Sequence, residues 1–212
     1  MEEFEMSDTG RMHYFFSLED MQLDNGIFIS QKRYTKKILK IFGMEKNNLV
    51  LNLNVPRVKI GNNDTSVTVI SSMFNQLVGI LIYLTITMLD LMYVVNVVKR
   101  HMAKPTETHC MATKRILRYV QGTMCFRIFY QRLGNQELVG YIDSDNARCI
   151  DDRKSTSGYA FILSNAVVAW SSRKHPIVTL NITEAEFIDA STCAGQLIWM
   201  KRVLSKLNYN GR

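Results

Sequence analysis

Two clusters of acidic residues, about forty positions apart, contain the side chains of this sequence that are best suited to catalytic chemistry. Asp143 and Asp145 follow the alternating apolar residues of a predicted strand, and side chains two positions apart leave the same face of a strand. Glu184, Glu186 and Asp189 open a helical pattern. Carboxylates on a strand that faces an acidic helix end can hold divalent metal ions over a phosphodiester, as two-metal hydrolysis requires.

Three strands and a helix must position these acids. Short apolar runs at 158–163 and 166–170 lie between the two clusters and are joined through Ser164 and Asn165. Their residue types predict two further strands, and Thr183 is the predicted N-cap of the helix that follows. The predicted order is therefore strand, strand, strand, helix, with acids on the first strand and at the head of the helix.

Four motifs in this region resemble the ribonuclease H domain of copia-type retrotransposon polyproteins. They are YIDSD (141–145), DDRKSTSGYAFIL (151–163), AWSSRK (169–174) and TEAEF (183–187). Upstream, 4–44, 76–85 and 115–123 resemble the end of the reverse transcriptase of the same polyproteins. The resemblance implies an α+β fold, in which a reverse-transcriptase hairpin and thumb or connection helices precede an incomplete ribonuclease H-like fold of three antiparallel strands plus a helix.

The resemblance also implies a domain organisation. Residues 1–44 correspond to the end of the reverse transcriptase palm, 71–135 to thumb or connection-like helices, and 136–212 to a partial ribonuclease H-like domain. Residues 45–70 contain Asn, Gly, Pro and Asp with weak periodicity, which predicts a linker. The parent activities are RNA-directed DNA synthesis and cleavage of the RNA strand in RNA–DNA hybrids.

By resemblance, Asp143 matches the first catalytic aspartate and Glu186 the helical glutamate, and both would bind Mg²⁺ or Mn²⁺. Glu184 is the other candidate, but it lies about 200° from Glu186 around a helix, so both cannot face one metal. An acid at a helix start can also simply complement the helix dipole. Asp189, where the family usually has a small residue, is either a further metal ligand or a chance replacement.

Several features of the family pattern are not found in this sequence. No Asp or Glu follows Asp189, whereas ribonuclease H-like folds continue into a strand with a third aspartate and later a fourth acid. The polymerase aspartates are expected upstream of residue 1. Glycine is expected near Ser17, arginine at Asn75 and tryptophan at Asn146. We therefore expect no efficient catalysis; residual metal-dependent ribonuclease H activity and a non-functional relic are the alternatives.

The basic charge lies mainly outside the acidic region. Residues 1–135 hold 17 Lys and Arg against 11 Asp and Glu, whereas residues 136–212 hold 9 against 8. A basic surface of this kind predicts an RNA–DNA hybrid or another nucleic acid as partner. The candidate contacts lie on predicted helices at 32–42 and 106–121, although such residues often only face solvent. They are Lys36, Lys37, Lys40, Lys114, Arg115 and Arg118.

Local signals predict the limits of several elements. The alternation over 12–30 surrounds Asp24-Asn25-Gly26, and Asn-Gly favours the positive backbone angles of a tight hairpin. The resemblance relates this hairpin to the part of a reverse transcriptase that holds the primer end. Gly43 and Gly122 are the predicted stops of the two basic helices.

Residues 77–98 are apolar enough to be read in two ways. Their length suits a membrane span, but Asp90 lies in the middle, where a charge costs about 3 kcal/mol on insertion. Two buried helices are the favoured interpretation. The four cysteines show no disulfide or zinc spacing, and no signal peptide, phosphate loop or Gly-x-Ser-x-Gly elbow is present. We expect an intracellular protein, in the cytoplasm or nucleus, that does not enter a membrane.

Overall fold

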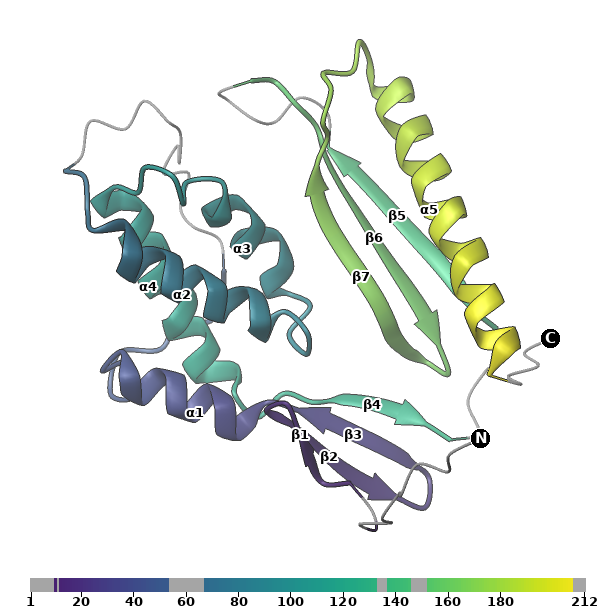
Figure 1. The fold of residues 1–212 in the computed structure, drawn as a ribbon, viewed down its shortest axis with the longest axis horizontal. Helices are drawn as coiled ribbons and strands as arrows, with labels where there is room; N and C mark the ends of the chain where they lie inside the picture. Colours follow the sequence, from purple (N-terminus) through teal and green to yellow (C-terminus); the bar gives the residue numbers. More distant parts are fainter. Residues whose placement is uncertain (1–9, 11, 54–66, 133–136, 146–151, 208–212) are drawn as a thin grey trace, which may run out of the picture.

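The computed structural model describes residues 10, 12–53, 67–132, 137–145 and 152–207. These residues form a mixed α+β structure with two antiparallel sheets, which confirms the α+β class of the prediction (Figure 1). In chain order the elements are β1 (Tyr14–Phe15), β2 (Leu18–Leu23), β3 (Gly26–Ser30), α1 (Lys32–Ile41), α2 (Ser71–Leu84), α3 (Leu91–Lys99), α4 (Glu107–Thr123), β4 (Ile128–Gln131), β5 (Val139–Asp145), β6 (Thr156–Leu163), β7 (Ala166–Lys174) and α5 (Ile182–Lys206).

The first sheet has the order β1-β2-β3-β4 and contains the predicted hairpin. Leu23 pairs with Gly26 across a two-residue turn. The prediction of positive backbone angles at this turn is wrong, however, because neither Asn25 nor Gly26 is among the described residues with positive φ. A Cβ on Gly26 would lie 2.3 Å from the backbone oxygen of Tyr130. Glycine is required here because β4 approaches closely, not because of the turn.

Positive φ angles occur at two other hairpin turns. Phe16 (45°) and Ser17 (63°) connect β1 to β2, and Ser164 (51°) and Asn165 (64°) connect β6 to β7. Two-residue turns with both φ angles positive match the right-handed twist of the strands that they join. Ser17 thus occupies a conformation that glycine favours, close to where the resemblance expects one.

The apolar stretch over 77–98 folds into two packed helices, as the sequence analysis favours. α2 ends at Leu84 and α3 begins at Leu91, and Leu81, Leu84 and Leu91 are fully buried in a core shared with α1 and α4. Asp90 lies exposed at the corner between these two helices and accepts a hydrogen bond from the Tyr119 hydroxyl. No helix among the described residues combines the length and the apolar character that crossing a bilayer requires.

The two basic helices differ in how they end. α1 ends at Ile41, and Gly43 follows with φ of 63°, as predicted. α4 does not stop at Gly122 but continues to Thr123, because Gly122 keeps a helical conformation. The apolar side of α4 is buried as predicted, with Ile116, Leu117 and Val120 in the core.

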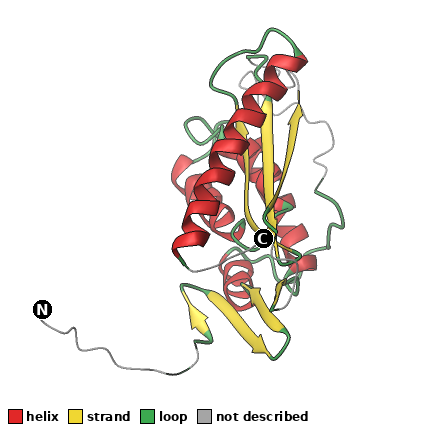
Figure 2. Cartoon of the chain, turned by 90° about the vertical axis from the view of Figure 1, so that its right-hand side faces the viewer, coloured by secondary structure: helices red, strands yellow, loops and turns green. Residues whose placement is uncertain are grey.

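The second sheet has the order β5-β6-β7 and lies between α5 and the helical region (Figure 1). Figure 2 shows the long helix α5 lying against its strands. Phe161 and Cys193 form the buried contact between sheet and helix. On the other face, α3 contacts β7, where the Asn96 side chain donates to the backbone oxygen of Ser172. The predicted strand–strand–strand–helix order is confirmed.

Candidate functional site

One groove brings together three of the acids that the sequence analysis singled out. Asp143 on β5 and Glu186 and Asp189 on α5 line a cavity of about 390 Å³ that also contains Ser144 and Thr183. Asp143 and Glu186 are exposed, whereas Asp189 is buried. Asp143 pairs in register with Gly158 of β6, so the antiparallel sheet fixes its position along the groove.

Glu184 has a structural role at the start of α5. The side chain of Asn181 is the N-cap and accepts from the Glu184 backbone N–H at 2.8 Å, while the Glu184 carboxylate accepts from the Leu180 backbone N–H at 2.6 Å. The predicted N-cap at Thr183 is wrong, because this reciprocal pair starts the helix two residues earlier. With Glu184 engaged in the cap, Glu186 is the glutamate that lines the groove.

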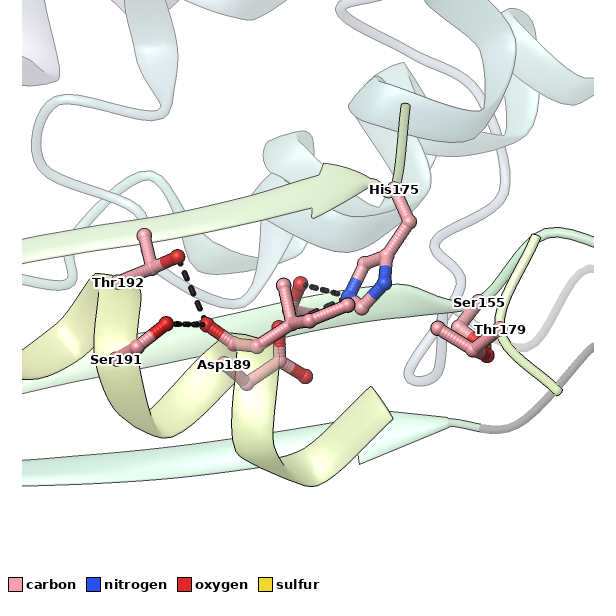
Figure 3. A network of polar contacts seen from close by, with 8 residues as sticks. Ser155, His175, Thr179, Asp189, Ser191 and Thr192 are labelled. Carbon is pink, nitrogen blue, oxygen red and sulfur yellow. Dashed lines mark hydrogen bonds and ion pairs between the residues drawn. The ribbon is translucent and has the colours of Figure 1, made fainter. Parts of the chain in front are cut away.

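Asp189 takes part in a buried polar network (Figure 3). Its Oδ1 lies 2.8 Å from Nε2 of His175, and the same Nε2 lies 2.7 Å from Oγ of Ser157. Asp189 Oδ2 and His175 Nδ1 are buried and have no hydrogen-bond partner in the part of the chain that the structure describes. The sequence analysis did not single out His175, because a lone histidine before a proline gives no pattern from which such a partner could be found.

Carboxylate oxygens, such as those of the exposed Asp143 and Glu186, are ligands that hard divalent cations prefer. Mg²⁺ in proteins is commonly held by one or two carboxylates together with substrate phosphates and water. No three His, Cys, Asp or Glu side chains of the described residues are close enough together to hold a metal ion. By resemblance, Asp143 and Glu186 are the pair expected to provide the protein ligands. Asp145 belongs to β5, but its side chain lies outside the described residues.

The predicted nucleic-acid contacts divide into two groups. Lys36, Lys37 and Lys40 on α1 are exposed, as is Lys114 on α4. The two arginines of α4 instead hold the chain that follows α1. Arg118 Nε donates to the Asn48 backbone oxygen at 2.6 Å, and Arg115 donates to the Asn52 side-chain oxygen at 3.3 Å.

Known proteins resemble this chain over most of its length. The uncharacterized mitochondrial protein AtMg00810 of Arabidopsis thaliana is 33% identical over 92% of this chain and 81% of its own length. The retrovirus-related Pol polyproteins from transposon RE1 of Arabidopsis thaliana and transposon TNT 1-94 of Nicotiana tabacum are 32% and 31% identical, each over 96% of this chain. The chain belongs to the copia-type retrotransposon Pol polyprotein family.

The chain spans 14% of the RE1 polyprotein and 16% of the TNT 1-94 polyprotein. No protein-family model matches it, and no solved structure does. Asp189, which the resemblance leaves open as a further metal ligand or a chance replacement, is a buried aspartate bonded to His175.

Proposed function

We propose that this chain is the part of a copia-type Pol polyprotein that connects the end of the reverse transcriptase to the start of the ribonuclease H. One observation carries the proposal for the second half. Asp143 and Glu186, which lie far apart in the sequence, line the same groove from a strand and a helix. The antiparallel sheet β5-β6-β7 with α5 on one face supplies the ribonuclease H-like part.

The first sheet and α1–α4 form the reverse-transcriptase part of this proposal. The β2-β3 hairpin corresponds to the element that holds the primer end, and α2–α4 correspond to thumb or connection helices. β4, the strand that follows α4, pairs with β3 of the hairpin, so segments from before and after the predicted linker meet in one sheet. This pairing gives the polymerase-derived residues one continuous body next to the nuclease-derived sheet.

In this proposal Asp143 and Glu186 are the residues that would hold Mg²⁺ or Mn²⁺, and an RNA–DNA hybrid is the substrate. A bound ion of this kind supplies charge stabilisation and an activated water for phosphodiester cleavage. Two protein carboxylates are fewer ligands than a two-metal site requires. We therefore expect the chain to bind the hybrid but to cleave it poorly. The exposed lysines of α1 provide the grip on the nucleic-acid backbone.

The metal site is tested by titrating the chain with Mn²⁺ and following the free ion by electron paramagnetic resonance. Asp143→Asn and Glu186→Gln should each weaken Mn²⁺ binding by at least about tenfold. Replacing a residue that only contacts a ligand already costs about that much affinity, so replacing the ligand itself should cost no less. Cleavage of a labelled RNA–DNA hybrid with Mg²⁺ is measured on the same samples. Any cleavage should disappear in Asp143→Asn.

Glu184→Gln is the matched control for Glu186→Gln. It removes the same charge two residues away, and glutamine can keep the capping bond to the Leu180 N–H. Mn²⁺ binding should therefore stay unchanged in Glu184→Gln. An equal loss of Mn²⁺ affinity in Glu184→Gln and Glu186→Gln would mean that the negative charge of the region attracts Mn²⁺ without a defined site. That result would reject the assignment of Glu186 as a ligand.

A further inference from the structure

His175 lies where three elements of the second sheet region meet. It follows the last residue of β7, and its backbone N–H donates to the Ser155 oxygen at 2.8 Å. Its Nε2 lies 2.7 Å from Ser157 Oγ on β6 and 2.8 Å from Asp189 Oδ1 on α5 (Figure 3). The side chains of His175 and Asp189 are only 3% and 4% exposed. One ring therefore ties β6 and the end of β7 to the helix.

This contact links the two candidate metal ligands through the fold. Ser157 pairs in register with Ser144, the neighbour of Asp143 on β5. Asp189 follows Glu186 by three residues, which is slightly less than one turn of α5. Ser157, His175 and Asp189 thus form a chain of polar contacts from the strand next to β5 to the helix turn that carries Glu186.

Apolar packing fixes the other half of α5. The buried contact of Leu138, Phe161 and Cys193 continues through partly buried residues toward the end of the helix; these are Leu197, Met200 and Leu204. Before Cys193, the buried residues of α5 are Ala185 and Asp189. An alanine buries little apolar surface. The first turns of the helix therefore depend on the polar contact for their position on the sheet.

The chemistry of His175 and Asp189 determines which side chain donates the hydrogen bond between them. An ionised carboxylate can only accept hydrogen bonds, so in the contact with Asp189 the donor is the Nε2–H group of His175. Hydrogen bonds to a charged acceptor are shorter and stronger than neutral ones. Removing His175 would leave the buried Asp189 carboxylate without this hydrogen bond, and removing Asp189 would leave His175 Nε2 with Ser157 alone, which cannot tie the ring to α5.

We propose that His175 and Asp189 are a positioning pair that fixes the first turns of α5 on the sheet and so sets Glu186 opposite Asp143. Asp189 acts here through His175 and not as a metal ligand. The part of the inference that concerns metal binding rests on the proposed function, whereas the fixing of the helix start does not.

The test uses the full chain with two measurements, amide hydrogen exchange along α5 and Mn²⁺ affinity. In Asp189→Ala, exchange should become faster over residues 182–189 while residues 193–206 change less, and Mn²⁺ affinity should fall about tenfold. Asp189→Asn keeps a side-chain acceptor for His175 and should restore most of both. Should Asp189→Ala not fold, His175→Gln carries the same test.

Cys193→Ala is the control, because it truncates the next buried residue on the same side of α5. It should lower the melting temperature without selective exchange at 182–189 and without loss of Mn²⁺ affinity. Uniformly faster exchange along α5 in Asp189→Ala, or unchanged affinity in a variant of a chain that binds Mn²⁺, would overturn the positioning role. Selective exchange in a chain that binds no Mn²⁺ would reject the proposed function alone and support the fixing of the helix start.

Discussion

Gly43 and Gly79 are two glycines for which the same substitution should have opposite effects. Gly43 follows α1 with φ of 63°, a conformation that costs a residue with a Cβ about 1–2 kcal/mol. Gly79 lies inside α2 with helical geometry, and a Cβ there meets nothing within 4 Å. Gly43→Ala should lower the free energy of unfolding by about 1 kcal/mol, whereas Gly79→Ala should raise it by about 0.5–1 kcal/mol.

Urea denaturation of both variants beside the unmodified chain measures these differences. Each substitution adds one methyl group at an exposed position, so the pair controls for added apolar surface. Changes of the same sign in the two variants would contradict the assignment of backbone conformation as the cause.

At the scale of single residues, the family motifs indicated two groove residues, whose role as ligands stays a prediction. Asp143 and Glu186 were identified from the resemblance, and the structure brings them into one groove. The cap of α5 was misplaced, because whether Asn181 or Thr183 caps depends on which side chain reaches the Glu184 N–H. His175 was missed because its partner lies on another element, and no spacing rule links a strand end to the second turn of a helix.

Elements with strong local signals were predicted well, and elements that depend on distant pairing were not. The hairpin, the three strands of the second sheet and α5 follow from alternation and turn residues. β4 was missed, because it exists by pairing with β3 about a hundred residues earlier. Gly26 illustrates the same limit. Only glycine fits at this position, because a Cβ would collide with the backbone oxygen of Tyr130 on that distant strand.

The corner between α2 and α3 is tied to α4 by the hydrogen bond from Tyr119 to Asp90. Burial, together with the hydrogen bond and the negative charge of Asp90, raises the pKa of Tyr119 to about 12. The folded chain therefore holds the phenol proton more tightly than the unfolded chain, in which the pKa of tyrosine is about 10. The resulting stability is fully present below pH 10 and is lost as pH rises from 10 to 12.

Tyr119→Phe should remove this contribution, so that the variant is less stable at neutral pH and loses less stability above pH 10. Denaturation at several pH values measures the difference, and ultraviolet absorbance follows the loss of one late-titrating tyrosine. Tyr130, whose pKa is also raised by burial, should still titrate late in the variant. Asp90→Asn keeps an acceptor without the charge and should lower the pKa of Tyr119. An unchanged absorbance titration in both variants would contradict the hydrogen bond between Tyr119 and Asp90.

Hydrogen bonds join the second sheet to the helices and to the first sheet. The Trp170 indole N–H donates to the Thr85 backbone oxygen at 2.9 Å, and the Tyr130 hydroxyl donates to the Val167 oxygen at 2.9 Å. Arg100 adds a bond of 3.3 Å to Thr156 at the end of α3. These contacts connect the basic part of the chain to the sheet that carries Asp143. In the proposed function, these contacts would fix the orientation of the nucleic acid bound by the lysines of α1 relative to Asp143 and Glu186.

The uneven charge of the molecule predicts how the proposed binding of nucleic acid should depend on salt. The basic excess lies in residues 1–135, where Lys36, Lys37 and Lys40 are exposed along α1. Binding to a labelled RNA–DNA hybrid should weaken steeply with salt, because each phosphate contact releases a counterion. Replacing the three lysines by glutamine should make the slope of log affinity against log salt shallower by about 2–3, since each contact contributes about 0.9 on a B-form duplex.

A second triple variant separates this grip from net charge. Lys99, Lys104 and Lys201 are also exposed but do not lie on α1, and their replacement by glutamine removes the same total charge. Arg118 is left intact in both variants, because it bonds to Asn48 and its loss would loosen the chain after α1. The control should keep a slope close to that of the unmodified chain. Equal slopes in the two triple variants would mean that overall charge, and not the face of α1, attracts the nucleic acid.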